Sequence, residues 1–169
     1  VNCSKGNAIP MEVSMPDGSV SRDLDTGLLR WKNDFSSLFQ TSNDANVIHV
    51  EGSGNENLDA SFNNGISILE VRKALLNVNK GKACGVDNIP VEVLNNDTSA
   101  AFLHVLFNIC FDKGIVPSLW SKCIIYTIPK SSTQDKKDPQ SYRGISLASS
   151  MYKLYCHILN SRLSIWAEE

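Results

Sequence analysis

The sequence has 169 residues, of which 42% are hydrophobic and 20% are charged, and its net charge is −2. This length suffices for one ordinary domain with a hydrophobic core, or for part of a larger one. The composition is typical of a soluble globular protein. No apolar run approaches the roughly 20 residues of a membrane-spanning helix, so we expect no membrane partner.

The charges are unevenly distributed along the chain. Up to Leu69 there are four Lys and Arg against nine Asp and Glu, whereas from Glu70 onward there are twelve against nine. Between residues 113 and 143, six cations are accompanied by only two aspartates. This local surplus fits a phosphate-facing patch, although a cluster of charges is more often a solvated face.

The ends of the chain and its cysteines indicate its context. The sequence has no initiator methionine or apolar signal segment and stops within an apparent helix, so we expect a piece of a longer protein. The five cysteines form no CxxC or Cys/His cluster, which favours reduced thiols in an intracellular protein of the nucleus or cytoplasm. Cys110, Cys123 and Cys156 lie among apolar residues, so we expect them to be small core residues.

Residues 1–66 are predicted to be an N-terminal extension with one helix. Residues 1–25 are polar and interrupted by proline and by an Asp-Gly pair, which is typical of a loop or short hairpin. From Thr26 to about Gln40, apolar residues recur at helical spacing and predict an amphipathic helix. Residues 41–66 are rich in Asn, Ser, Gly and acidic residues, which predicts a flexible linker.

Residues 67–169 carry most of the predicted structure, and helices dominate it. Ser67-Ile-Leu-Glu70 has the form of a capping box and opens a helix. Pro90 can start a short helical turn, and Asp97 or Thr98 is expected to cap a longer helix that ends at Gly114.

Two short strands precede a final helix that is predicted from about Ser149. The first is an apolar run that stops at Lys130, the second contains Arg143, and a polar connection joins them. The predicted fold class is therefore α+β: helix-rich with a small antiparallel β element.

Lys130 and Arg143 are the leading candidates for binding a phosphate chain. Two fixed cations near the bend of a hairpin can bind phosphates, which makes a nucleotide or nucleic acid the first ligand to consider. Each residue also has a structural explanation. A lysine on an edge strand opposes aggregation, and an arginine in a loop often donates to carbonyls.

The loop from Lys80 to Asn88 is a second candidate. Lys80 and Lys82 can contact phosphates while Gly81 and Gly85 let a backbone approach closely. A helix end followed by a turn, with lysines placed for the helix dipole, explains the same residues and is the more common case.

Other chemical signals are weak. Asp87 is more readily a local backbone acceptor than a metal ligand. Tyr126 and Tyr142 can stack on bases, whereas Trp120 is better explained as a core anchor. The sequence contains no Walker loop, GxSxG, HExxH or paired-carboxylate motif, and so no complete catalytic machinery.

Taken in order, several segments resemble the reverse transcriptase of non-LTR (LINE-like) retrotransposons. The loop Lys80-Gly-Lys-Ala-Cys-Gly-Val-Asp-Asn-Ile-Pro90 is similar to the family's GKAPGxDGIP. The remaining segments are Leu29–Phe39, Glu70-Val-Arg-Lys-Ala-Leu, Leu106-Phe-Asn with Gly114–Trp120, Ile124–Lys130, Asp138–Leu147 and Lys153–Leu163. The resemblance covers roughly residues 26–169 and is strongest from Glu70 onward.

The resemblance implies that residues 67–169 are the fingers and the start of the palm of a right-hand RNA-directed DNA polymerase. Its partners would be an RNA template, a DNA primer and deoxynucleoside triphosphates. Lys130 and Arg143 match the cations that contact the incoming triphosphate. The loop with Lys80, Lys82 and Gly85 would lie near the template.

The same comparison implies what the chain lacks. The family's catalytic aspartates, which hold Mg²⁺ for nucleotidyl transfer, would lie beyond residue 169. We therefore expect no catalytic residue and no metal site in this chain. Without the rest of the palm and the thumb, we expect the fragment to be inactive. Cys84, Asn88 and Gly144 replace a proline, a glycine and a proline of the family's motifs. These departures leave an alternative open: a non-catalytic relic that acts as a weak RNA-binding or protein-interaction module.

Overall fold

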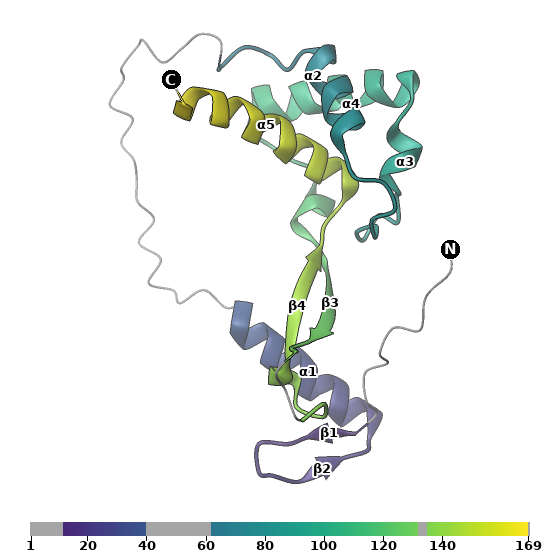
Figure 1. Cartoon of the computed structure of the whole chain (residues 1–169), viewed down its shortest axis with the longest axis vertical. Coiled ribbons are helices and arrows are strands. Elements are labelled where there is room, and N and C mark those ends of the chain that lie inside the picture. The colour runs from purple at the N-terminus through teal and green to yellow at the C-terminus, as the bar shows by residue number, and fades with distance from the viewer. Residues whose placement is uncertain (1–11, 40–61, 132–134, 169) are drawn as a thin grey trace. The chain divides into compact units, whose positions relative to one another are not determined.

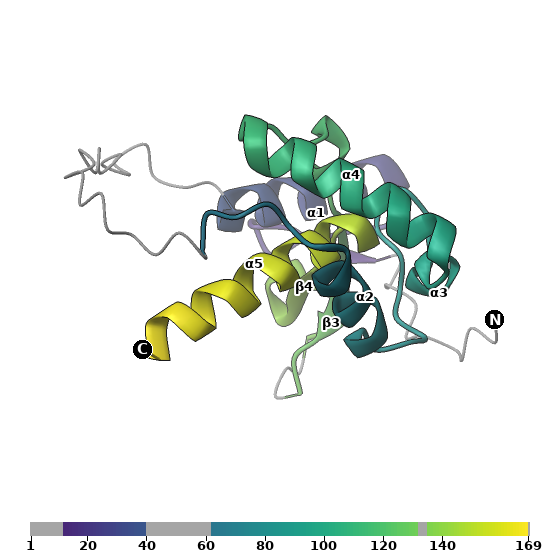
Figure 2. The ribbon, with the colours of Figure 1, turned by 90° about the horizontal axis from the view of Figure 1, so that it is seen from above.

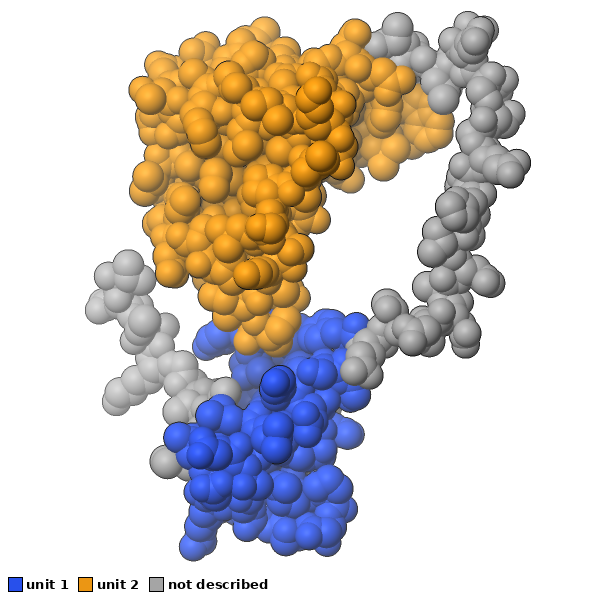
Figure 3. Space-filling view, turned by 180° about the vertical axis from the view of Figure 1, so that it is seen from behind, with its two compact units in different colours: residues 1–49, 126–145 blue, residues 50–125, 146–169 orange. Residues whose placement is uncertain are grey.

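The computed structural model describes residues 12–39, 62–131 and 135–168, which fall into two compact units (Figures 1 and 3). Unit 1 comprises Val1–His49 and Tyr126–Ile145, and unit 2 comprises Val50–Ile125 and Ser146–Glu169. This division differs from the predicted boundary at 66/67, because residues 126–145 group with the N-terminal part of the chain. Helices combine with two small antiparallel sheets, so the α+β prediction is confirmed.

Unit 1 begins with the short hairpin expected in the N-terminal residues. Strands β1 (Val13–Ser14) and β2 (Val20–Ser21) pair antiparallel. Helix α1 (Leu24–Phe39) follows and starts two residues before the predicted position. The earlier start has a local cause: a side-chain oxygen of Asp23 accepts the backbone N–H of Thr26 at 2.9 Å, which satisfies a donor of the first turn.

Aromatic side chains hold α1 against the segment that precedes β4 (Tyr142–Leu147). The ring of Trp31 stacks on Phe35 with centroids 5.8 Å apart and meets the edge of Tyr142 at 4.9 Å. Pro139, in the short 3-10 helix η2 (Pro139–Ser141), is also fully buried. The apolar core of unit 1 is thus small and largely aromatic.

Helix α2 (Ile68–Asn77) opens unit 2 with the predicted capping box. The Ser67 hydroxyl accepts the N–H of Glu70 at 3.2 Å, and a Glu70 carboxylate oxygen accepts the N–H of Ser67 at 2.7 Å. The reciprocal pair satisfies two donors that a helix start otherwise leaves open. Val71 and Leu75 of this helix are buried.

Two further helices follow the loop after α2. Helix α3 (Val91–Leu94) starts directly after Pro90, as predicted. Helix α4 (Asp97–Lys113) is capped by Asn96, whose side chain accepts the N–H of Ser99, so the predicted cap was one or two residues late. Gly114 ends α4 with φ +64°, the left-handed conformation expected of a glycine cap.

Helix α5 (Ser150–Glu168) completes unit 2, and α2 packs against both α4 and α5 (Figure 2). Phe107 and Leu103 of α4 are fully buried, as is Leu154 of α5. Trp120, in the 3-10 helix η1 (Ser118–Ser121), meets the rings of Phe107 and Tyr155 at 6.2 and 5.6 Å, which confirms it as a core anchor.

Residues 62–66, at the end of the predicted flexible linker, instead pack into unit 2. Ile66 is buried, and its N–H and C=O are both bonded by the Asn108 side chain at 2.7 and 2.8 Å. Arg162 donates to the carbonyls of Phe62, Asn64 and Gly65. The rest of the predicted linker, 41–61, lies outside the described residues.

Strands β3 (Ile124–Pro129) and β4 pair as the second sheet (Figure 1). Side-chain exposure alternates along β3, as expected for an extended strand. In the described ranges, no helix is both long and apolar enough to cross a membrane.

Candidate functional site

Lys130 lies directly after β3, where the sequence places it, and its side chain is exposed. Its backbone N–H donates to the carbonyl of Ser141 at 2.9 Å, and its Nζ donates to the carbonyl of Gln140 at 2.7 Å. The lysine therefore bridges the two sides of the connection between β3 and β4.

Arg143 is the second residue of β4, and its side chain is exposed. The backbone hydrogen bond from Lys130 to Ser141 sets the register of the two antiparallel strands. In this register Arg143 lies opposite Ile128, and Ile128 is also exposed. Lys130 and Arg143 are then diagonal neighbours on one face, a separation that two long cationic side chains can span. Among the described residues, the Arg143 guanidinium makes no ion pair.

The aromatic residues near this pair differ in their availability. Tyr142 is buried; its hydroxyl donates to the carbonyl of Lys136 at 2.9 Å, and burial together with the Asp135 charge raises its pKa. Tyr126, on β3, leaves 53% of its surface exposed. Of the two tyrosines considered for stacking on bases, only Tyr126 is therefore exposed enough to meet one.

The loop after α2 presents Lys80 and Lys82 with both side chains exposed. Gly81, between them, has φ +71°, and its N–H donates to a carboxylate oxygen of Glu92, which lowers the pKa of that group. This bond fixes the loop to the start of α3. The lysines are thus carried by a backbone that the protein itself holds in place.

Gly85 is buried, and the backbone it approaches belongs to the chain itself. A Cβ at this position would lie 2.4 Å from the carbonyl carbon of Ala148 and 2.5 Å from the nitrogen of Ser149. Only glycine fits this close approach. The structure therefore explains Gly85 by packing, and the template contacts predicted for Lys80, Lys82 and Gly85 remain predictions.

Asp87 is a local acceptor, as expected for a lone aspartate beside a turn. One carboxylate oxygen accepts the hydroxyl of Ser149 at 2.6 Å, and the other accepts the N–H of Ile89 at 3.3 Å. The hydroxyl of Ser150 donates to the carbonyl of Ile89 at 2.8 Å. These bonds join the loop to the start of α5.

Asn88 is the single described non-glycine residue with a positive φ, +53°. After glycine, asparagine is among the residues that best tolerate the left-handed region. Residue 88 therefore favours glycine, asparagine or aspartate for backbone reasons.

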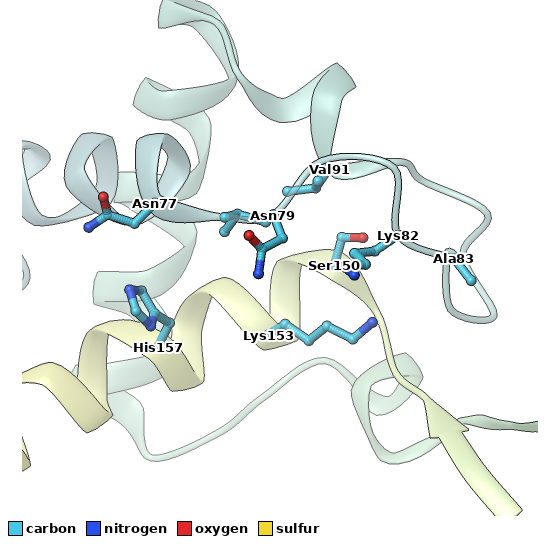
Figure 4. A pocket seen from close by; sticks show the side chains of 9 residues that line it. Asn77, Asn79, Lys82, Ala83, Val91, Ser150, Lys153 and His157 are labelled. Carbon is cyan, nitrogen blue, oxygen red and sulfur yellow. The ribbon is translucent and has the colours of Figure 1, made fainter.

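A cleft of about 370 Å³ lies beside this loop, and sequence reasoning missed most of it (Figure 4). The loop contributes Lys82, and α5 contributes Lys153 and His157, four residues apart and therefore on one helix face. That i, i+4 spacing was the available signal. The full lining is Asn77, Val78, Asn79, Lys82, Ala83, Val91, Ser150, Lys153 and His157.

The described residues do not fit the Mg²⁺ that the resemblance implies for the whole enzyme. In these ranges, no group of three or more His, Cys, Asp or Glu side chains is arranged to hold a metal ion. We therefore derive no metal-dependent step from them.

The cysteines differ in part from the sequence prediction. Cys110 is buried, and burial raises the pKa of its thiol. Cys156 is half-buried, but Cys123 is exposed just before β3, so the prediction of a core residue was wrong there. All four described cysteines are free thiols, and Cys3 lies outside the described residues.

Comparison with known proteins gives no assignment. No protein-family model matches the sequence, and no curated protein matches it significantly.

Proposed function

We propose that this chain supplies template and nucleotide contacts in a reverse transcriptase of the non-LTR retrotransposon type. In this proposal residues 67–169 are part of the fingers and the start of the palm. Lys130 and Arg143 contact the incoming deoxynucleoside triphosphate, and Lys80 and Lys82 contact the RNA template. The resemblance of the ordered segments is the basis of the proposal.

One observation carries it: the loop that resembles the family's GKAPGxDGIP packs closely against the two residues that directly follow the resembling segment Asp138–Leu147, more than 60 residues later in sequence. Gly85 admits the backbone of Ala148 and Ser149 at distances that no other residue allows, and Asp87 accepts the Ser149 hydroxyl. Asn88 occupies the family's glycine position and has the positive φ that such a position demands. Gly85 and Asn88 of the resembling loop therefore occupy positions where the backbone geometry favours their residue types.

A second pair of resembling segments is also in contact. Arg162 donates to both carboxylate oxygens of Glu70, at 2.7 and 3.0 Å, and its guanidinium lies 5.4 Å from the ring centre of Phe111. The arginine side chain is only 11% exposed. The two helices that carry these segments are therefore joined by a largely buried ion pair.

Nucleotide binding by the whole chain tests the proposal. We expect Lys130→Gln and Arg143→Ala each to weaken binding of a fluorescent deoxynucleoside triphosphate by about 1–3 kcal/mol, roughly 5- to 150-fold in Kd. Glutamine keeps a donor for the Gln140 carbonyl while it removes the charge. Equilibrium fluorescence anisotropy measures both variants.

Lys136→Gln is the matched control, because Lys136 is an exposed lysine in the same connection between the strands. We expect it to leave the Kd within about twofold. Unchanged affinity in both the Lys130 and Arg143 variants would remove the nucleotide role from this hairpin.

A protein-interaction role is the second candidate, and the surface of α4 favours it. Phe102, Val105 and Ile109 recur along this helix with 60, 58 and 55% of their surfaces exposed. Sedimentation of the chain over a range of concentrations tests this alternative: self-association that is lost in Phe102→Ser supports it, and a monomer at all concentrations counts against self-association through this face.

A further inference from the structure

We propose that the cleft between the loop after α2 and α5 seats one nucleotide of a single-stranded RNA, with its phosphate at Lys82 and Lys153. The inference rests on the proposed function and extends it. It adds template contacts from α5 to those predicted for the loop after α2. The size, charge and hydrogen-bonding groups of the cleft carry it.

The two lysines reach the cleft from opposite walls. Figure 4 shows Lys82 on the loop and Lys153 on α5 with their side chains extending toward the same end of the cleft, near Ser150. Neither ammonium group makes an ion pair with another described residue. Ser150 also begins α5, and the partial positive charge of a helix start favours an anion nearby.

No carboxylate lines the cleft, so the positive charge is not neutralised within it. Glu92 directly follows Val91 of the cleft, Asp87 bonds the residue that precedes Ser150, and each already accepts hydrogen bonds. Glu92 accepts the N–H of Gly81, and Asp87 accepts the Ser149 hydroxyl and the N–H of Ile89. A phosphate is therefore the ligand group that the lysines favour.

The other end of the cleft offers groups suited to a base. Asn77 and His157 lie there, with Asn79 between them and the lysines (Figure 4). An asparagine amide both donates and accepts, and an imidazole can stack on a base or bond its edge. Cations at one end and amides with an imidazole at the other match the two ends of a nucleotide.

The dimensions select a single strand. A cleft of about 370 Å³ is at the lower end of the range for small-molecule sites and has room for one nucleotide unit, but not for a base-paired helix. Proteins reach the base edges of RNA mainly where the bases are unstacked and splayed out. Duplex RNA should therefore bind less tightly than a single strand of equal length.

Anisotropy of a labelled 12-nucleotide single-stranded RNA with the whole chain tests the inference. We expect Lys82→Gln and Lys153→Gln each to raise the Kd about tenfold. Each should also reduce the slope of log Kd against log salt by about 0.7, because one phosphate contact is lost from a single strand. A lysine with a merely structural role would not change that slope.

Lys73→Gln is the control, because Lys73 is an exposed lysine on α2 that does not line the cleft. We expect its Kd and salt slope to equal those of the unchanged protein. A second measurement does not depend on folding of a variant: bound RNA should protect Lys82 and Lys153, but not Lys73, from acetylation detected by mass spectrometry.

The outcomes separate this inference from the proposed function. The cleft proposal is overturned if the protein binds RNA, both cleft variants keep the salt slope of the unchanged protein, and Lys82 and Lys153 are not protected from acetylation. In that case a template role for other residues of the chain still stands. Equal affinity for duplex RNA also overturns the cleft proposal. If the unchanged protein does not bind RNA at low salt, both the cleft proposal and the template role are overturned. Nucleotide binding at Lys130 and Arg143 is tested separately, by the nucleotide-binding experiment.

Discussion

The two units of this protein are stabilised in different ways. Unit 2 surrounds a continuous apolar core in which Phe107, Leu103 and Leu154 are almost fully buried. Unit 1 buries a few aromatic rings, and its helix α1 contains the buried atoms without a hydrogen-bond partner in the described ranges: Arg30 Nε, Trp31 Nε1 and Asp34 Oδ2. Such atoms are unfavourable where water is excluded.

The contrast bears on the two candidate sites. The cleft of unit 2 is built on helices and on a loop that packing and hydrogen bonds fix. The cations of unit 1 extend from a two-stranded hairpin, and two strands alone give marginal stability. A site on such an element adjusts to its ligand more readily than a site on a packed core.

The largest effect is expected for Phe107→Ala in unit 2. Phe107 is 0% exposed and contacts the rings of Trp120 and Tyr155, so its truncation leaves a cavity and costs about 3–5 kcal/mol of unfolding free energy. Urea denaturation measures the change. Phe102→Ala, on the exposed side of the same helix, should change stability by less than about 0.5 kcal/mol; equal effects would contradict the described core.

Gly85→Ala comes next, with an expected loss of about 2–3 kcal/mol. The added methyl would overlap the backbone of Ala148 and Ser149, which the bond between Asp87 and Ser149 holds beside the loop. Thermal unfolding measures the loss. Gly81→Ala is the comparison: its Cβ meets nothing within 4 Å, so the change is limited to backbone strain at φ +71°, about 1 kcal/mol.

A pH dependence of about 1–2 kcal/mol is expected from the ion pair between Glu70 and Arg162. The Arg162 guanidinium, with help from Ser67, lowers the pKa of Glu70 from 4.5 to about 2, while burial opposes the shift. Because the folded-state pKa is the lower one, the stabilisation is fully present above about pH 4.5 and is lost as pH falls toward 2. One-third of the Glu70 side chain is exposed, and solvent screening reduces the effect.

Urea denaturation at several pH values measures this loss, with Glu70→Gln as the reference. The variant should lack the part of the acid sensitivity that this carboxylate supplies. The same slope below pH 4.5 in both proteins would show that the ion pair contributes nothing.

The smallest effect is expected in unit 1, for Tyr142→Phe. The substitution keeps the contact with Trp31 and removes the bond from the tyrosine hydroxyl to the Lys136 carbonyl, which is worth about 0.5–1.5 kcal/mol. Hydrogen exchange of the β3 and β4 amides measures it locally. A loss as large as that of Phe107→Ala would remove the difference between the units.

The sequence predicts the helices of unit 2 well, because its signals there are local. The capping box of Ser67 and Glu70, the start after Pro90 and the stop at Gly114 each depend on a few neighbouring residues. The packing of residues 62–66 was missed, since the groups that bind them, on Asn108 and Arg162, come more than 40 residues later.

The candidate sites follow the same division. Lys130, Arg143, Lys80 and Lys82 were predicted from their own motifs, and their side chains are exposed; their roles stay predictions. The cleft brings residues of the loop together with Lys153 and His157 of a helix some 70 residues later, which a sequence pattern does not specify. Gly85 was read as a place for a ligand, and only the fold shows Ala148 and Ser149 beside it.

Arg162 has a consequence for the order in which unit 2 folds. It reaches back across 92 to 100 residues to Glu70 and to the carbonyls of Phe62, Asn64 and Gly65. Contacts of such long sequence separation form late, because a large loop must close first. During synthesis, the faces of α2 and α4 that later meet α5 therefore stay uncovered until α5 has left the ribosome.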